Sequence, residues 1–123
     1  MATTIGGPGI RGVEALDNEE TLCEIVAEHS GAPRTYEGKL FVTNFRILFL
    51  PFETERILGA APLDLPRKEL ASISYTLPET GELLRTPRAE LRIRARDDHS
   101  YHFTTAFHRE EFQALLGALG VGG

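Results

Sequence analysis

Hydrophobic and polar residues alternate over several short stretches of the chain, and this period of two predicts β-strands. Residues 21–28 are compatible with a helix or a strand, and we favour a strand because the chain turns directly after them. Residues 37–51 contain two apolar runs on either side of Thr43-Asn44. Further strand-like stretches follow at residues 63–65, 69–77, 89–96 and 100–104. The pattern therefore predicts seven short antiparallel strands, because each pair of neighbours is joined by a segment that favours turns or loops.

The hairpin predicted around Thr43-Asn44 pairs residues whose numbers add up to 87. The facing pairs are Val42 with Phe45, Leu40 with Ile47, and Gly38 with Phe49. These side chains point to one side of the sheet, since strand side chains alternate, and we expect them to be buried. The other side has Phe41, Leu48 and Leu50, which we expect to lie beneath another segment. If they were left exposed together, they would mark a partner surface.

The C-terminal segment has a different period. Phe112, Leu115, Leu116 and Leu119 recur at the spacing of one helical stripe. Thr105 is a candidate N-cap, Glu110 and Glu111 suit the first turns, and Gly120 can end the helix. The predicted fold is therefore mainly β with one helix: a small seven-stranded antiparallel β-sandwich or barrel capped by a C-terminal α-helix.

The length of 123 residues suggests one domain. We expect a flexible N-terminal lead over residues 1–13, the domain over residues 14–119, and a flexible tail over residues 120–123. No apolar run approaches the roughly 20 residues that a membrane-spanning helix needs. The single cysteine, Cys23, cannot form an internal disulfide, which favours a reducing compartment such as the cytoplasm.

The net charge of −5 argues against generic nucleic-acid binding, which needs a basic domain or stripe. The charge is uneven, because residues 85–96 contain five arginines against Glu90 alone. These are Arg85, Arg88, Arg92, Arg94 and Arg96. Arg92, Arg94 and Arg96 lie on one face of a predicted strand and could bind phosphates, since guanidinium groups match phosphate geometry. The interpretation we favour is a solvated face paired with neighbouring acids.

The sequence contains no motif that indicates metal binding or catalysis. In "DDHSYH", residues 97–102, His99 and His102 would point to opposite faces of a strand and would not converge on a metal with Asp97 and Asp98. Cys23 lacks the arginine of a phosphatase loop, and neither a Gly-rich phosphate loop nor a catalytic carboxylate pair is present. We expect no enzyme activity, no cofactor and no small-molecule substrate, and Cys23 is expected to be a core or edge residue.

The stretch "GKLFVTNFRILF", residues 38–49, resembles the glycine–x–leucine–x–valine–threonine–asparagine–aromatic–arginine pattern of GRAM domains. The most similar form is the PH-GRAM domain of myotubularin phosphatases. Later segments resemble family segments in the same order: "LDLPRKELASISYT", "LRIRARDDHSYHFTT" and "FHREEFQALLGAL". The resemblance covers about residues 16–119. It implies a pleckstrin-homology-like fold, a cytoplasmic setting, peripheral membrane association through phosphoinositides or binding of protein partners, and no catalysis.

In a pleckstrin-homology-like strand order, the loops after the first, third and sixth strands open at one end. These loops contain Arg34, Arg56 and Arg96, and also Glu53, Glu55, Asp97 and Asp98. Our candidates for binding anionic lipid headgroups are Arg34, Lys39, Arg46, Arg56 and Arg96, with Arg92 and Arg94 as a secondary basic face. The resulting hypothesis is a non-catalytic membrane-targeting or adaptor module. The alternative is a protein-interaction domain of the same fold without lipid binding.

Overall fold

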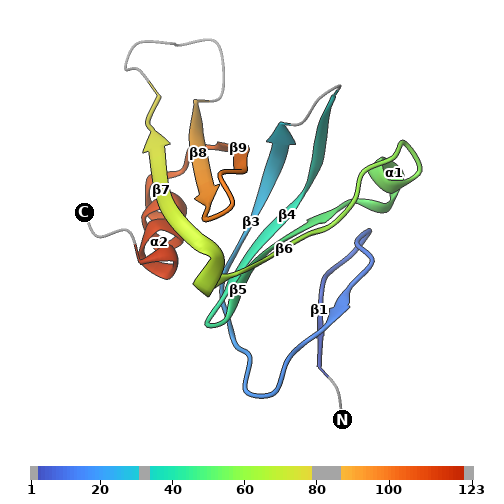
Figure 1. Cartoon of the computed structure of the whole chain (residues 1–123). Coiled ribbons are helices and arrows are strands. Elements are labelled where there is room, and N and C mark those ends of the chain that lie inside the picture. Colours follow the sequence, from blue (N-terminus) through green and yellow to red (C-terminus); the bar gives the residue numbers. More distant parts are fainter. Residues whose placement is uncertain (1–2, 31–33, 79–86, 121–123) are drawn as a thin grey trace.

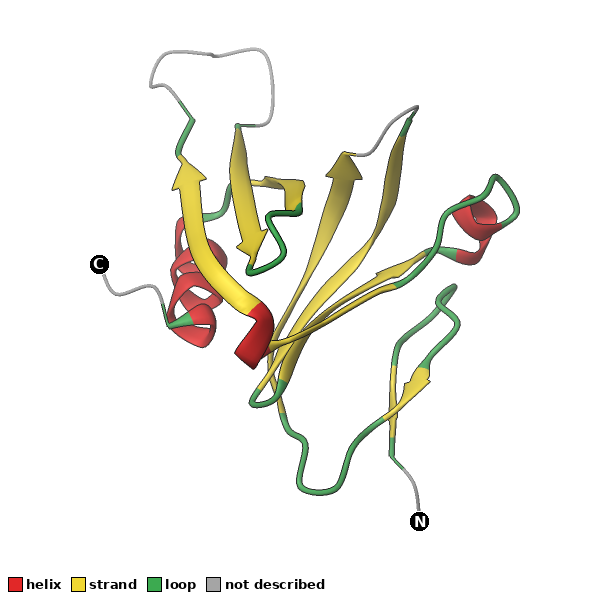
Figure 2. Cartoon of the chain, in the orientation of Figure 1, coloured by secondary structure: helices red, strands yellow, loops and turns green. Residues whose placement is uncertain are grey.

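Nine strands, two α-helices and one 3₁₀ helix make up the computed structural model, which describes residues 3–30, 34–78 and 87–120. The strands are β1 (Thr4–Ile5), β2 (Val13–Glu14), β3 (Thr21–Ser30), β4 (Thr35–Thr43), β5 (Arg46–Pro51), β6 (Leu63–Pro66), β7 (Leu70–Thr76), β8 (Arg88–Ala95) and β9 (Ser100–Ala106). The helices are α1 (Glu53–Arg56), the 3₁₀ helix η1 (Arg67–Glu69) and α2 (Arg109–Leu119). The seven strands and the C-terminal helix predicted from the pattern are confirmed (Figures 1 and 2).

The seven longer strands form one antiparallel sheet in the order β6-β5-β4-β3-β9-β8-β7. Strand β9 returns to β3, so that Ser30 pairs with both Thr35 of β4 and His102 of β9. Among the described residues no pairing joins β6 to β7, so the sheet is bent but not closed into a barrel. Figure 1 shows β3–β6 and β7–β9 as two diverging layers, with α2 beside the second.

The main core lies between these layers and is completed by α2. The inward side chains of the sheet and the apolar stripe of the helix form one buried cluster, which includes Leu40, Ile47, Phe49, Leu91, Ile93, Phe103, Phe112, Leu115 and Leu119. Leu116 packs against its margin. The helix ends at Gly120, whose φ of 80° lies in the left-handed region, as expected for a glycine cap. Arg67 Nη2 donates a 2.6 Å hydrogen bond to Ala118 O and joins η1 to the end of the helix.

The helix starts later than predicted. His108, not Thr105, is the N-cap residue, and its side chain makes no capping hydrogen bond. Thr105 is a buried residue of β9, and its hydroxyl donates to Val26 O at 2.9 Å. The prediction was wrong because this hydroxyl found a partner across the sheet.

The β4–β5 hairpin has the predicted faces but a different register. Val42 pairs with Ile47, and Leu40 with Phe49, so the paired numbers add up to 89 rather than 87. A shift of two residues leaves every side chain on the same face. The turn is displaced because Thr43 Oγ1 accepts hydrogen bonds from the backbone N–H groups of Phe45 (3.1 Å) and Arg46 (3.0 Å). Phe45 is therefore a turn residue that is 40% exposed, and the expectation that it is buried was wrong.

Gly38 lies opposite Pro51, not opposite Phe49. A Cβ atom at this position would lie 2.6 Å from Pro51 Cα and would also collide with Leu50 O. The glycine is thus needed for a close approach of two backbones, whereas the sequence suggested room for an aromatic ring.

Residues 3–13, within the stretch predicted as a flexible lead, pack against the sheet. β1 and β2 pair with each other, and Ile5 and Ile10 are buried in a second apolar cluster with Phe41, Leu48 and Leu50 of the sheet. The outer face of the hairpin therefore does lie beneath another segment, as predicted. Residues 1–2 and 121–123 lie outside the described residues.

Candidate functional site

Arg46, one of the predicted anion-binding residues, is buried in an ion-pair network. Its guanidinium donates to both carboxylate oxygens of Glu19 at 2.8 and 2.9 Å, to Asp64 Oδ2 at 2.8 Å, and to Glu14 O at 3.0 Å. The Arg46 side chain is 9% exposed and that of Glu19 is fully buried. Four of the five guanidinium N–H groups are therefore engaged inside the protein, which leaves little of Arg46 for a headgroup.

The Glu19 carboxylate is held in its charged form by this network. Burial raises the pKa of Glu19, but hydrogen bonds from Arg46 and from the Thr43 hydroxyl outweigh it and lower the pKa below its ordinary value of 4.5. The stability contributed by Glu19 is present above pH 4.5 and is lost as the pH falls through the lower, folded-state pKa. The arginine in the "TNFR" motif of this chain thus ties the connection between β2 and β3 to the β4–β5 turn.

The loop after β3, the connection containing α1 and the start of β9 emerge at one end of the sheet. Ser30 pairs with Thr35 and His102 at this end, and Phe52 N donates to Glu37 O where β5 runs into α1. Arg34 is exposed and directly precedes β4, and Arg56 is the last residue of α1. Arg96 follows β8, and its backbone N–H donates to Glu69 O at 2.8 Å, beside η1. The strand register therefore associates Arg34 more closely with α1 than with Arg96.

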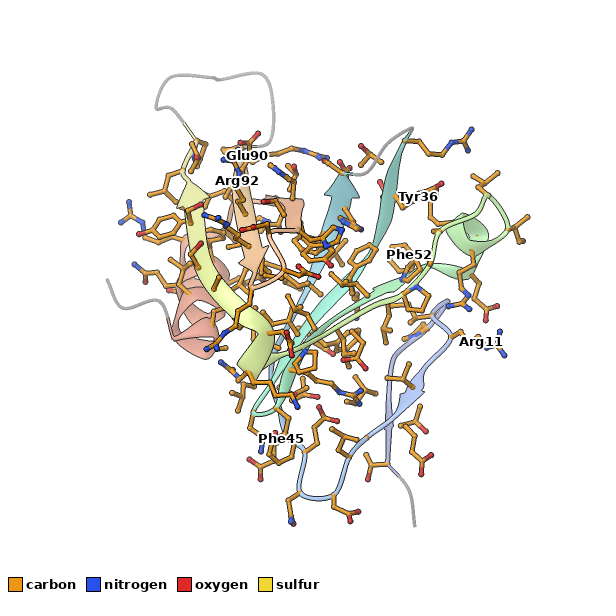
Figure 3. All side chains as sticks on the ribbon, in the orientation of Figure 1. Arg11, Tyr36, Phe45, Phe52, Glu90 and Arg92 are labelled. Carbon is orange, nitrogen blue, oxygen red and sulfur yellow. The ribbon has the colours of Figure 1, made fainter. Side chains whose placement is uncertain are left out.

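The connection between β5 and β6 has two exposed aliphatic residues at its tip, Ile57 and Leu58. Ile57 is 86% exposed and Leu58 is 56% exposed. Backbone hydrogen bonds close this tip: Leu58 N to Glu55 O at 3.0 Å and Gly59 N to Arg56 O at 3.0 Å. Tyr36 OH also donates to Leu58 O at 3.5 Å, which links the tip to the start of β4 (Figure 3). From the sequence we expected a loop here, and we did not identify its two adjacent aliphatic residues as part of a candidate site.

The other predicted headgroup-binding residues, Lys39, Arg92 and Arg94, lie away from the connection that contains α1. Lys39 is half-buried on the outer face of β4, in a depression of about 430 Å³ whose acidic residues are Glu24 and Glu111. Arg92 lies on the exposed face of β8 between Ser74 and His102, in a shallow depression of about 240 Å³ that also contains Glu90 (Figure 3). Arg94 is paired with Asp98 at 2.7 Å, and Arg88 with Glu28 at 2.9 Å. Arg85 lies outside the described residues. The structure thus distributes the seven candidates over several surfaces.

The segment "DDHSYH" forms a polar turn. Asp97 Oδ2 lies 3.0 Å from His99 Nδ1. The pKa of Asp97 is lowered chiefly by a hydrogen bond from the backbone N–H of His99, and to a smaller extent by a hydrogen bond from the His99 ring. Asp98 has a φ of 71° and is paired with Arg94. Within the three described ranges, no group of three His, Cys, Asp or Glu residues is placed to hold a metal ion.

Two titratable groups near the core are perturbed by burial. His29 stacks on Phe103 at 4.9 Å and meets the edge of Phe49 at 5.3 Å. Burial lowers the pKa of His29 below 6.5, and His102 lowers it further. Burial, with the charges of Glu111 and Glu24, raises the pKa of Cys23 above 9.0. Cys23 therefore stays a protonated thiol, which is a poor nucleophile.

We expect the stability to decrease as the pH falls below 6.5, because the folded state resists protonation of His29 while the unfolded state does not. The measurement is the free energy of unfolding in urea at a series of pH values between 7 and 5. His29→Phe keeps an aromatic ring in the stack and should flatten this dependence. His108→Gln, at an exposed histidine, is the matched control, and a flattened profile there would contradict the assignment.

The strand order, the bent sheet and the C-terminal helix define a pleckstrin-homology-like β-sandwich. No helix among the described residues has the length and apolar character needed to cross a bilayer. No family model matches the chain, and no curated protein matches its sequence. The fold is similar to the crystal structure of the C-terminal domain of an unknown protein from Leishmania infantum, with a TM-score of 0.59 and 15% sequence identity over 84% of this chain and 86% of that chain. This likeness concerns the fold alone.

Proposed function

We propose that this protein is a non-catalytic cytoplasmic module that associates peripherally with anionic membranes, including those containing phosphoinositides. The observation that supports this proposal most directly is the exposed apolar tip, Ile57 and Leu58, directly after Arg56. An aliphatic pair held out in water by a hydrogen-bonded turn has no role in the core of the domain. The resemblance of residues 38–49 to GRAM domains agrees with this function.

Apolar contact supplies more of the proposed binding than charge does. Fully burying an aliphatic side chain contributes about 1.5–3 kcal/mol, so two contribute several kcal/mol on insertion. A basic residue near an anionic surface contributes about 1 kcal/mol. Glu53 and Glu55 in α1 offset Arg56 and nearby Arg34, so the local net charge is small. The expected binding therefore depends only modestly on salt.

Replacing both tip residues, Ile57→Ser with Leu58→Ser, should weaken binding to vesicles by about 3 kcal/mol, which is roughly a hundredfold. The change of Arg34 and Arg56 to alanine should weaken it by about 2 kcal/mol at low salt. The measurement is co-sedimentation with phosphatidylcholine vesicles that contain phosphatidylserine or a phosphoinositide. Thermal melts of each variant confirm that the fold is retained.

The matched control is Leu16→Ser with Leu22→Ser. Both residues are about half exposed. They lie at the opposite end of the sheet from the tip, on either side of Glu20, whose carbonyl accepts a hydrogen bond from Asn44 N in the β4–β5 turn. These changes should leave vesicle binding unaltered. An equal loss in the control would show that binding has no defined site. If the unmodified protein bound no vesicle of any composition, the membrane proposal would be wrong and protein docking would be the remaining hypothesis.

A further inference from the structure

The two edges of the sheet differ in how well they are protected against pairing with another strand. An edge strand exposes unpaired backbone N–H and C=O groups, and proteins protect such edges with short strands, prolines and charges. β6 has all three features: it spans four residues, ends in Pro66, follows Pro62, and contains Asp64. Among the described residues β7 also pairs on one side only, with β8. It spans seven residues with no proline and no charge, and a register shift against β8 between Leu70 and Ser72 interrupts only its start.

The edge segment Leu70–Leu77 has no charged residue and no proline. Ala71, Ser72, Ser74 and Thr76 are exposed, Tyr75 is 39% exposed, and Leu77 is 50% exposed. Figure 1 shows β7 as the outermost strand of its layer, with β8 on one side. This edge therefore presents both an unpaired backbone and partly exposed apolar side chains to a further strand.

The sequence of this edge complements itself when two copies run antiparallel about Ser74. Facing residues then have numbers that add up to 148. The facing pairs are Ser74 with Ser74, Ile73 with Tyr75, and Ser72 with Thr76. Hydroxyl groups face hydroxyl groups and apolar groups face apolar groups, which are favourable cross-strand combinations. A two-fold axis through Ser74 gives this match at every position from Ser72 to Thr76, where the register of β7 against β8 is regular.

The charges on the neighbouring strand do not oppose a second copy, because all of them lie three strand spacings from the charges of the other copy. On β8, Glu90 lies beside Thr76, Arg92 beside Ser74, and Arg94 beside Ser72. In the symmetric pair, each Glu90 shares a cross-strand row with the Arg94 of the other copy. The two Arg92 residues share the central row but are separated by three strand spacings, about 14 Å, which exceeds the screening length in physiological salt.

We propose that β7 is a dimerisation edge, at which two copies of this chain pair antiparallel about Ser74 to form one continuous sheet. The partner is a second copy because the edge matches itself in side-chain character from Ser72 to Thr76. A closed two-fold contact of this kind uses the same residues in both copies. The proposal is independent of membrane binding, because the Ile57–Leu58 tip belongs to the connection between β5 and β6.

The first experiment is sedimentation equilibrium over a wide range of protein concentrations. The unmodified protein should form a dimer as the concentration rises. Ser74→Lys places two like charges opposite each other at the axis and should raise the dissociation constant at least tenfold. Ser100→Lys, at an exposed position of β9 on the far side of β8, should not alter it. A protein that remains a monomer at every concentration would overturn the proposal.

The second experiment tests the register and does not depend on a destabilising change. In a Cys23→Ala background, Ser74→Cys should form an intermolecular disulfide under mild oxidation, because residues facing each other have Cβ atoms about 5 Å apart. Ser72→Cys should not, since the two copies of residue 72 would be about 14 Å apart in this register. Equal cross-linking at both positions would exclude the proposed pairing.

Discussion

Truncation after Thr105 is expected to abolish the cooperative unfolding transition of this protein. Phe112, Leu115 and Leu119 of α2 are buried in the same cluster as the inward side chains of both sheet layers. Removing the helix exposes these sheet residues to water. The measurement is thermal and urea unfolding followed by circular dichroism. A cooperative melt of the truncated chain would show that the helix is dispensable.

A point substitution in α2 also tests whether the helix is part of the core, without removing any of the chain. Phe112 is 1% exposed and meets Tyr75 and Phe107 edge to face at 5.8 Å. Phe112→Ala should cost about 3–5 kcal/mol of unfolding free energy, as is typical for deleting a buried aromatic ring. Its neighbour Gln113 is exposed, so Gln113→Ala should change the stability by about 0.5 kcal/mol or less.

Arg46→Met is expected to destabilise the protein by about 3–5 kcal/mol, because it leaves the buried carboxylate of Glu19 without its ion-pair partner. Methionine retains most of the aliphatic length of arginine, so the change isolates the loss of charge and hydrogen bonds. The measurement is urea unfolding at neutral pH. Arg94→Met is the matched control: its partner Asp98 is exposed, and such surface pairs contribute about 0–1 kcal/mol.

A double substitution separates the value of the pair from the cost of an unpaired charge. Arg46→Met combined with Glu19→Met should recover much of the lost stability, since it removes the buried carboxylate as well. A loss below about 1 kcal/mol in Arg46→Met alone would mean that Glu19 finds water or another donor. If Arg94→Met lost as much unfolding free energy as Arg46→Met, burial of the ion pair would not be what determines its contribution to stability.

The outcome for Arg46 illustrates what sequence reasoning could not supply. An arginine among aromatic residues next to a turn is compatible with a headgroup ligand and with a structural ion pair. Its partners, Glu19 and Asp64, are 27 and 18 residues away along the chain. No local pattern associates residues that far apart, and only the packing of β2, β5 and β6 around the turn brings them together. The same holds for the candidate site, whose arginines and lysine proved to lie on different surfaces.

The sequence by itself determined the elements and the faces of this protein. Alternation along residues 89–96 placed Arg92 and Arg94 on one face. The structure exposes both and buries the alternate residues Leu91, Ile93 and Ala95, because side-chain direction follows directly from strand geometry. The helical stripe from Phe112 to Leu119 and the glycine after it were read correctly for the same local reason.

Tertiary structure alone decided the features that depend on contacts between distant segments. The register of β4 and β5 changed by two residues because the Thr43 hydroxyl closed the turn one step further on. The order of residues 3–15 depended on an apolar sheet face, Phe41, Leu48 and Leu50, that Ile5 and Ile10 could cover. A short glycine-rich segment has little structure of its own, and only burial against a preformed surface offsets the entropy lost on ordering it.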